Sequence, residues 1–218
     1  MNATFQDRVD AGRQLAEALR EYAGRAGLIV LELPRGGVPV AFEVALALDA
    51  PLDVFLVRKL GVPGQEELAM GAIASGGVRV MNERVVGELE LTEDAIAAVA
   101  AAEQHELERR ELELRGGQAA EPVEGRAAIL VDDGLATGAS MRAAVTALRA
   151  QAVGELVVGV PIASPEVCAS FENDVDAIVC ARTPEPFRAV GLWYENFSQT
   201  TDDEVRELLE QARARAAR

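Results

Sequence analysis

Two stretches of the chain repeat the order strand, glycine-containing turn, helix and strand, and this repeat restricts the possible folds more than any other feature. The first stretch spans residues 28–57 and the second spans residues 127–160. Their strand segments are runs of Val, Ile and Leu without polar alternation, which is typical of parallel strands covered on both faces. A strand, a helix and a parallel strand in this order form a right-handed crossover. We therefore predict an α/β fold built on a parallel sheet.

Hydrophobic periodicity gives the extent of the individual elements. The predicted strands are residues 28–33, 53–57, 127–131, 155–160 and 175–180. The predicted helices are residues 7–23, 38–49, 139–151 and 165–171, with a further helix from Thr201 that docks on the core. A chain of 218 residues is long enough for one large domain of this kind. We expect residues 1–218 to form that single domain.

A region of different composition separates the two stretches. Residues 71–74 and 78–81 can pair as a short hairpin, and residues 92–115 are rich in Ala, Glu and Arg. Thr92 is a favourable helix N-cap, and the acids after it suit a helix N-terminus. We predict that residues 82–125 form a helical insertion on the α/β core.

Charge and hydropathy exclude several classes of function. The chain has 21 Lys and Arg residues against 36 Asp and Glu residues, which gives a formal net charge of −15. Nucleic-acid binding relies on clustered basic side chains, so we predict no nucleic-acid partner. The sequence has neither a signal-peptide pattern nor an apolar run long enough to span a membrane. We therefore expect a cytoplasmic protein without a membrane partner.

The two cysteines give no indication of chemistry. Cys168 and Cys180 lie in a predicted helix and a predicted strand, without the spacing of a metal site or a redox motif. We interpret them as ordinary core thiols.

The segment from Ile129 to Ser140 carries the main chemical signal. Its strand ends in Asp132 and Asp133, which places two carboxylates at the edge of a parallel sheet where ligands bind. Such acids can accept hydrogen bonds from the hydroxyls of a sugar and can help to hold Mg²⁺. The turn that follows has small side chains, so its backbone N–H groups can surround a phosphate at a helix N-terminus. The turn residues are Ala136, Thr137, Gly138, Ala139 and Ser140. Simple helix capping is the alternative, and it leaves the paired acids unexplained.

This segment resembles the phosphoribosylpyrophosphate signature of the type I phosphoribosyltransferases. The resemblance covers about residues 28–197 and is strongest to a stand-alone branch usually called putative phosphoribosyltransferases. It implies a Rossmann-like core with a small C-terminal hood, here residues 184–218. It also implies that Asp132 and Asp133 meet the ribose hydroxyls and Mg²⁺, and that the turn holds the 5′-phosphate. The implied substrates are 5-phosphoribosyl-1-pyrophosphate (PRPP) and a nitrogenous base, and the implied assembly is a homodimer.

Basic residues fall where that family binds pyrophosphate. Arg35, Gly36 and Gly37 follow the first strand and resemble the family's pyrophosphate loop, although a plain turn is the alternative. Arg58 and Lys59, the only Lys of the chain, follow the second predicted strand. We predict that these two residues and Arg35 form one positive focus for a polyanion.

Two further segments carry charged side chains. Residues 61–67 have Gly hinges and few apolar side chains, and we predict a mobile lid there. The Glu and Arg run at residues 106–115 is interpreted as a solvated helix face, with a contact to substrate as the alternative.

The acceptor site is predicted from a cluster of aromatic residues near the C-terminus. Phe187 and Trp193 belong to this cluster, and a planar base could stack on them. An anchor for the C-terminal helix is an equally good interpretation. Hypoxanthine and guanine enzymes of the family carry an Asp just before the Thr-Gly pair, where this chain has Ala136, and this disfavours a 6-oxopurine acceptor.

The resulting hypothesis is a Mg²⁺-dependent transferase that moves the phosphoribosyl group to a nitrogen nucleophile and releases pyrophosphate. Its catalytic residues would be Asp132, Asp133, Lys59 and Arg58. The alternative is a catalytically silent protein that senses PRPP and regulates a partner.

Overall fold

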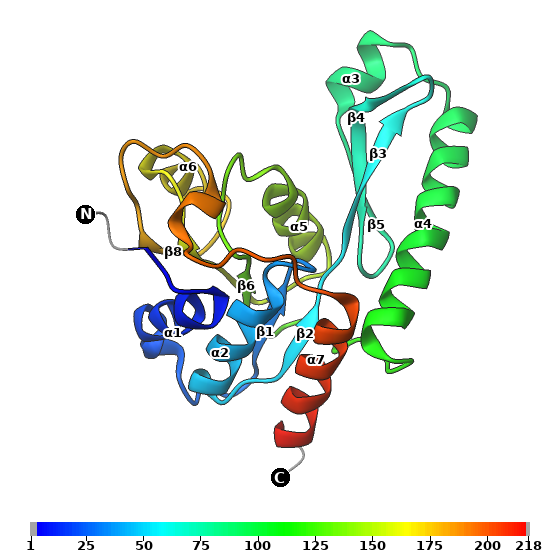
Figure 1. Ribbon diagram of the computed structural model, residues 1–218. Coiled ribbons are helices and arrows are strands. Elements are labelled where there is room, and N and C mark those ends of the chain that lie inside the picture. The colour runs from blue at the N-terminus through cyan, green and yellow to red at the C-terminus, as the bar shows by residue number, and fades with distance from the viewer. Residues whose placement is uncertain (1–3, 217–218) are drawn as a thin grey trace.

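The core of the protein is a five-stranded sheet in which every neighbouring pair of strands is parallel. The computed structural model describes residues 4–216. The strand order is β2-β1-β6-β7-β8 (Figure 1). The strands are β1 (Leu28–Glu32), β2 (Leu52–Val54), β6 (Ala127–Val131), β7 (Glu155–Ile162) and β8 (Ala177–Arg182). The predicted parallel α/β core is therefore confirmed.

Helices cover both faces of this sheet, which explains the apolar character of its strands. Leu28 and Val30 point into one core, whereas Ile29 and Leu31 point into the other. The first face is covered by α1 (Arg8–Ala18), α2 (Val38–Leu48) and α7 (Asp202–Ala216), and the second by α5 (Ala139–Ala150) and α6 (Pro165–Ala169). Short 3₁₀ turns occur at η1 (Arg20–Tyr22) and η2 (Val190–Trp193). Within residues 4–216 no helix has the length and apolar character needed to cross a bilayer.

A second, antiparallel sheet projects from this core as an arm, with α4 running alongside it (Figure 1). The arm consists of β3 (Val57–Val62), β4 (Gln65–Ala74), β5 (Val78–Met81), α3 (Glu83–Glu88) and α4 (Glu93–Arg115). The predicted hairpin is confirmed, because Ala74 pairs with Val78 and Gly71 with Met81. The helices α3 and α4 lie within residues 82–125, the range predicted for a helical insertion, and β3 to β5 of the arm precede that range.

Residues 53–67 differ from the predictions in two respects. The second parallel strand ends at Val54, and residues 55 and 56 connect it to β3 of the arm, which begins at Val57. Residues 61–67 form the tip of a hairpin in which Val62 pairs with Gln65 across a tight turn, and their movement as a lid stays a prediction. Pro63 and Gly64, with φ of 77° at Gly64, are suited to such a turn. The unbroken apolar run from residue 54 to 57 conceals this change of sheet.

The prediction of free core thiols is wrong, because Cys168 and Cys180 form a disulfide. Cys168 lies on α6 and Cys180 on β8, and packing of this helix on the strand brings their Cα atoms to 6.6 Å. The contact arises from tertiary packing, so the spacing of the cysteines in the sequence did not reveal it.

A buried ion pair joins the base of the arm to the core. Arg115, at the end of α4, donates from Nε to Oδ1 of Asp53 at 2.9 Å and from Nη2 to the Val54 carbonyl at 2.8 Å. The side chains are only 5% and 2% exposed. Arg213 of α7 donates to the Arg115 carbonyl at 2.9 Å. The pair therefore fixes α4 against β2 and α7.

A second buried carboxylate lacks such a partner. Glu32, the last residue of β1, is fully buried, and neither carboxylate oxygen has a hydrogen-bond partner among the described residues. Burial is the main cause that raises the pKa of Glu32 well above its usual value, and the nearby Asp132, Asp53 and Asp133 raise it further. The folded chain therefore favours the protonated form of Glu32 more than the unfolded chain does.

Replacing Arg115 with Ala is expected to lower the free energy of unfolding by about 3–5 kcal/mol, because Asp53 would remain buried without its counter-charge. Urea unfolding measures the loss. The control is Arg109→Ala on the exposed face of the same helix, where a loss of about 0–1 kcal/mol is expected. Equal losses in the two variants would contradict the role of the buried pair.

Replacing Glu32 with Gln is expected to change how stability depends on pH. The folded chain holds the Glu32 proton to higher pH than the unfolded chain, so the wild type loses stability as pH rises above the ordinary value of 4.5. Gln has no proton to lose. The free energy of unfolding of the Gln variant, relative to that of the wild type, should therefore increase by at most about 1.4 kcal/mol for each unit of rising pH. Urea unfolding between about pH 5 and about pH 8 measures this difference. Parallel stability curves for the two proteins would refute it.

Candidate functional site

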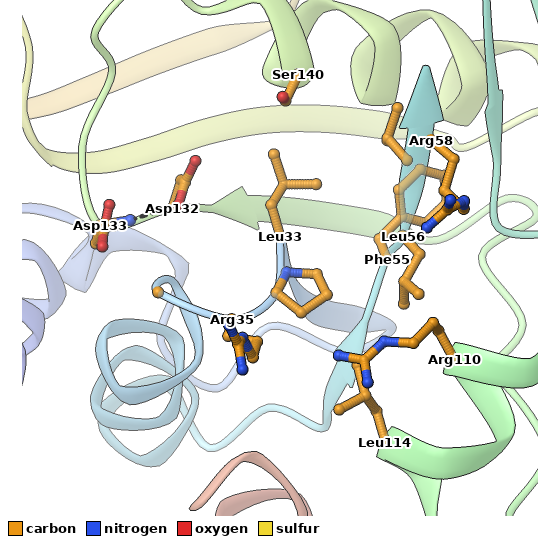
Figure 2. A pocket seen from close by; sticks show the side chains of 13 residues that line it. Leu33, Arg35, Phe55, Leu56, Arg58, Arg110, Leu114, Asp132, Asp133 and Ser140 are labelled. Carbon is orange, nitrogen blue, oxygen red and sulfur yellow. Dashed lines mark hydrogen bonds between the residues drawn. The ribbon is translucent and has the colours of Figure 1, made fainter. Parts of the chain in front are cut away.

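A cavity of about 340 Å³ opens at the edge of the sheet where β1 and β6 end. Figure 2 shows Asp132 and Asp133 on one side of this cavity and Arg58 and Arg110 on the other. Its polar lining consists of Arg35, Arg58, Arg110, Asp132, Asp133 and Ser140. Six of the predicted site residues line this cavity, namely Arg35, Gly36, Arg58, Asp132, Asp133 and Ser140.

The two acids after β6 are held in fixed positions. Asp132 accepts a hydrogen bond from the backbone N–H of Asp133 at 2.8 Å. Oδ2 of Asp133 accepts two bonds from Arg8, at 2.9 Å from Nε and 2.8 Å from Nη2. The Tyr194 hydroxyl donates to the Asp133 carbonyl at 2.6 Å. Arg8 also lies over the ring of Phe197, 4.0 Å from its centroid. Arg8 is a site residue that the sequence does not predict.

The acid end of the site carries more carboxylates than counter-charges. Burial, and then the charge of Asp133, raise the pKa of Asp132 to about 8. Burial raises the pKa of Asp133 as well, and the Arg8 guanidinium opposes that rise. The buried Glu32 lies close enough to add to this field. A cation that reached Asp132 would therefore be favoured electrostatically.

These carboxylates fit one particular mode of Mg²⁺ binding. No group of three or more potential ligand side chains gathers anywhere in residues 4–216, so a cage made of protein alone is absent there. Mg²⁺ commonly binds through one or two carboxylates together with water and the phosphates of a substrate. Asp132 and Asp133 suit that mode, because both line the cavity.

The loop after β1 lies directly against the acids. A Cβ atom added to Gly36 would collide with the carboxylate of Asp133. Only glycine allows the backbone to approach this closely, as the resemblance to a pyrophosphate loop requires. Gly37 follows it and begins α2. The loop therefore offers backbone N–H groups and the Arg35 side chain beside the acids.

The turn from Ala136 to Ser140 is open and leads into α5. Gly138 is the N-cap of the helix with φ of 74°, and an added Cβ would lie 2.8 Å from the Phe171 ring. Arg142 braces the turn by donating to the Thr137 carbonyl at 3.3 Å. The side chains of Ala136, Thr137, Ala139 and Ser140 are exposed. Because the first N–H groups of a helix lack intrahelical partners, this turn can bind an anion.

Arginines reach the cavity from three separate elements: Arg35 from the loop after β1, Arg58 from β3 and Arg110 from α4. Nε of Arg58 donates to Glu103 of α4 at 2.6 Å. Arg110 lies in the run that was interpreted as a solvated face, so the alternative of a contact to substrate describes its position better.

Lys59 does not lie beside Arg58 in the cavity, so the predicted positive focus of these two residues and Arg35 is wrong. Both belong to β3, and consecutive residues of a strand point to opposite faces. Lys59 pairs with the exposed Glu67 at 3.2 Å and lines a second cavity of about 400 Å³. Ser140 lines both cavities. A catalytic role for Lys59 stays a prediction.

The predicted base-stacking residues lie outside the lining of the first cavity. Trp193 is buried in a cluster with Phe5 and Ile162, and Phe187 packs against that cluster. Residues 184–200 thus fasten the N-terminal segment, and α7 packs on α2 and α4. The alternative prediction, an anchor for the C-terminal helix, is not confirmed by this cluster, because it contains Phe5 and Ala11 but no described residue of α7.

Comparison with known proteins identifies the family. A model described as phosphoribosyl transferase domain matches residues 3–167. Two curated Mycobacterium tuberculosis proteins, from strains CDC 1551 / Oshkosh and ATCC 25618 / H37Rv, are each named putative phosphoribosyl transferase and are 51% identical over 208 residues. That match covers 95% of this chain and 47% of each relative, so the chain spans about half their length.

A solved structure is similar over nearly its whole length. The crystal structure of TT1426 from Thermus thermophilus has 39% sequence identity and a TM-score of 0.83, and the match covers 95% of this chain and 98% of that one. The family resemblance predicted from Ile129 to Ser140 is therefore confirmed. On its sequence and on the architecture of its sheet and site, the chain belongs to the family of the phosphoribosyl transferase domain.

Proposed function

We propose that this protein transfers the 5-phosphoribosyl group from PRPP to a nitrogenous acceptor and releases pyrophosphate. The observation that carries this proposal is the division of one cavity into an acid side and a basic side, with an open anion-binding turn beside the acids. A phosphorylated pentose needs hydroxyl acceptors and a phosphate site, and its pyrophosphate needs cations.

The donor would lie across the cavity in one orientation. Its 5′-phosphate would meet the backbone of the turn from Ala136 to Ser140. Its ribose hydroxyls would donate to Asp132 and Asp133. Its pyrophosphate would lie toward Arg35 and Arg58, beside the backbone of Gly36 and Gly37. Each part of the donor would thus face a group that can form hydrogen bonds or ion pairs with it.

In the reaction, the bond between C1 of the ribose and the pyrophosphate oxygen breaks, and its electron pair leaves with the pyrophosphate. A bond from the acceptor nitrogen to C1 forms, and the proton that this nitrogen carried is released to the solvent. Positive charge develops on the ring, as in other glycosyl transfers, and negative charge develops on the leaving pyrophosphate. The arginine side chains would stabilise that leaving group. Mg²⁺, held by Asp132 and Asp133 together with donor oxygens, would neutralise further negative charge.

The test of the proposal is pyrophosphate release from PRPP with Mg²⁺ across a panel of purine, pyrimidine and pyridine bases. Release that depends on one acceptor supports the transferase. Tight PRPP binding without turnover on any base would contradict the transferase and would favour a protein that only senses PRPP. Failure to bind PRPP at millimolar concentration would overturn both.

Above about pH 8, where Asp132 is ionised, Asp132→Asn is expected to weaken PRPP binding by about 1–3 kcal/mol, because charge-assisted hydrogen bonds to the ribose would be lost. Titration calorimetry with Mg²⁺ present measures this loss. Asp174→Asn removes the same charge from an exposed loop outside the cavity and is the matched control. If both variants bind PRPP as the wild type does, Asp132 has no part in the site.

A further inference from the structure

We propose that Arg110 of α4 binds the pyrophosphate end of the donor and that Asp202, the first residue of α7, is its positioning residue. The inference rests on the proposed function and adds a contact from the arm to the donor site. It also assigns a role to the N-terminal end of the last helix.

Arg110 is placed to meet a ligand in the cavity. It lines the cavity together with Arg35 and Arg58, and its side chain is 23% exposed. In Figure 2 its guanidinium faces the cavity from the side opposite the two acids. The proposed donor would point its pyrophosphate toward this side, because its ribose and 5′-phosphate face the acids and the turn.

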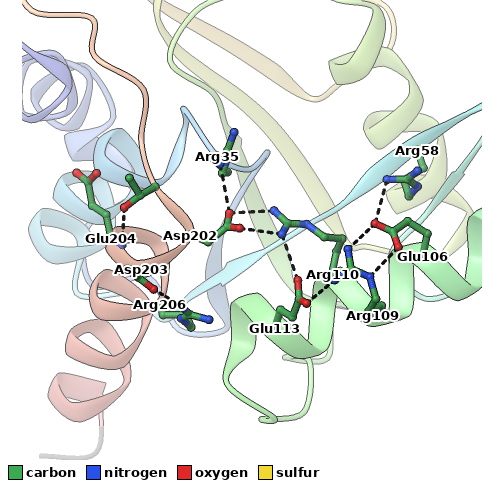
Figure 3. A network of polar contacts seen from close by, with 11 residues as sticks. Arg35, Arg58, Glu106, Arg109, Arg110, Glu113, Asp202, Asp203, Glu204 and Arg206 are labelled. Carbon is green, nitrogen blue, oxygen red and sulfur yellow. Dashed lines mark hydrogen bonds and ion pairs between the residues drawn. The ribbon is translucent and has the colours of Figure 1, made fainter.

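Asp202 holds this guanidinium with a two-pronged contact. Nη1 of Arg110 donates to Oδ2 of Asp202 and Nη2 donates to Oδ1, both at 2.9 Å (Figure 3). Nη1 also donates to Glu113 at 3.2 Å. A guanidinium has five N–H groups, and in the described part of the chain Nε–H and one Nη2–H remain for a ligand. The carboxylate therefore orients Arg110 without using all of its donors.

The same carboxylate reaches a second arginine of the cavity. Nη1 of Arg35 lies 3.5 Å from Oδ1 of Asp202, so Asp202 lies between Arg35 and Arg110 (Figure 3). Hydrogen bonds from Arg110 hold the pKa of Asp202 below its usual value. One charged residue at the start of α7 thus sets the spacing of two cations that come from distant parts of the sequence.

Comparison with Arg109, the preceding residue, shows that only one face of α4 presents an arginine to the cavity. Arg109 pairs with Glu106 and Glu113 on its own helix, is 47% exposed and does not line the cavity. Pairs of that kind contribute little to stability and bring no charge to a ligand. Arg110 instead lines the cavity, where its remaining N–H groups can meet an anionic ligand.

Calorimetry on Arg110→Gln tests the assignment with three ligands, namely PRPP, inorganic pyrophosphate and ribose 5-phosphate, each with Mg²⁺. Affinity for PRPP and pyrophosphate is expected to fall by about 10-fold to 100-fold, because a charge-assisted contact is lost. Affinity for ribose 5-phosphate should stay unchanged, since that ligand does not extend to Arg110. Arg109→Gln is the matched control and should bind all three ligands as the wild type does.

Two more variants separate positioning from folding. Arg110→Lys keeps the charge but cannot make the two-pronged contact, so a smaller loss of pyrophosphate affinity is expected. Asp202→Asn should also weaken pyrophosphate binding while leaving ribose 5-phosphate binding unchanged. Equal losses for both ligands would indicate general damage to the site and would overturn the positioning role.

The outcomes distinguish this inference from the proposed function. If the wild type does not bind PRPP, the proposed function fails, and the assignment of Arg110 fails with it. If the wild type binds PRPP and Arg110→Gln binds pyrophosphate equally well, only the assignment of Arg110 is overturned.

Discussion

The parallel pairing of β1 with β6 is the constraint on which the site depends. Glu32 pairs with Val131, so both strands end at the same level of the sheet. The loop after β1 and the acids after β6 therefore emerge side by side, close enough that Gly36 tolerates no side chain. Neither loop would make a donor site alone, because one supplies a cation and backbone donors and the other supplies the acids and the open turn. Covering helices on both faces fix this register.

The cavity gathers basic side chains, although the chain as a whole is acidic. A net charge of −15 would repel a polyanion, yet three arginines converge on one cavity, and carboxylates outside it hold them in place. The buried pair of Arg115 and Asp53 fixes the end of α4 to the core. Arg110 lies little more than one helical turn before Arg115. The buried ion pair of Arg115 therefore also fixes the position of Arg110 relative to the cavity. The stability of the arm and the geometry of the cavity thus depend on the same helix end.

Local patterns predicted the strands, the helices and the segment from Ile129 to Ser140, because turn chemistry and apolar runs are encoded by neighbouring residues. Contacts between distant residues were not predictable in this way. Arg8 meets Asp133 across 125 positions of the sequence, and Arg110 meets Asp202 across 92. No periodicity signals such pairs, and Arg110 resembles the other charged residues of its helix. Lys59 was misplaced for a different reason, since an unbroken apolar run concealed the passage from one sheet to the other.

A crystal structure with PRPP and Mg²⁺ bound tests the central claim most directly. The position of each phosphate relative to the two loops is the quantity to measure. The arrangement described here predicts the 5′-phosphate at the turn from Ala136 to Ser140 and the pyrophosphate beside Arg35 and Arg58. A donor bound elsewhere, or one with its 5′-phosphate among the arginines and its pyrophosphate at the turn, would contradict it.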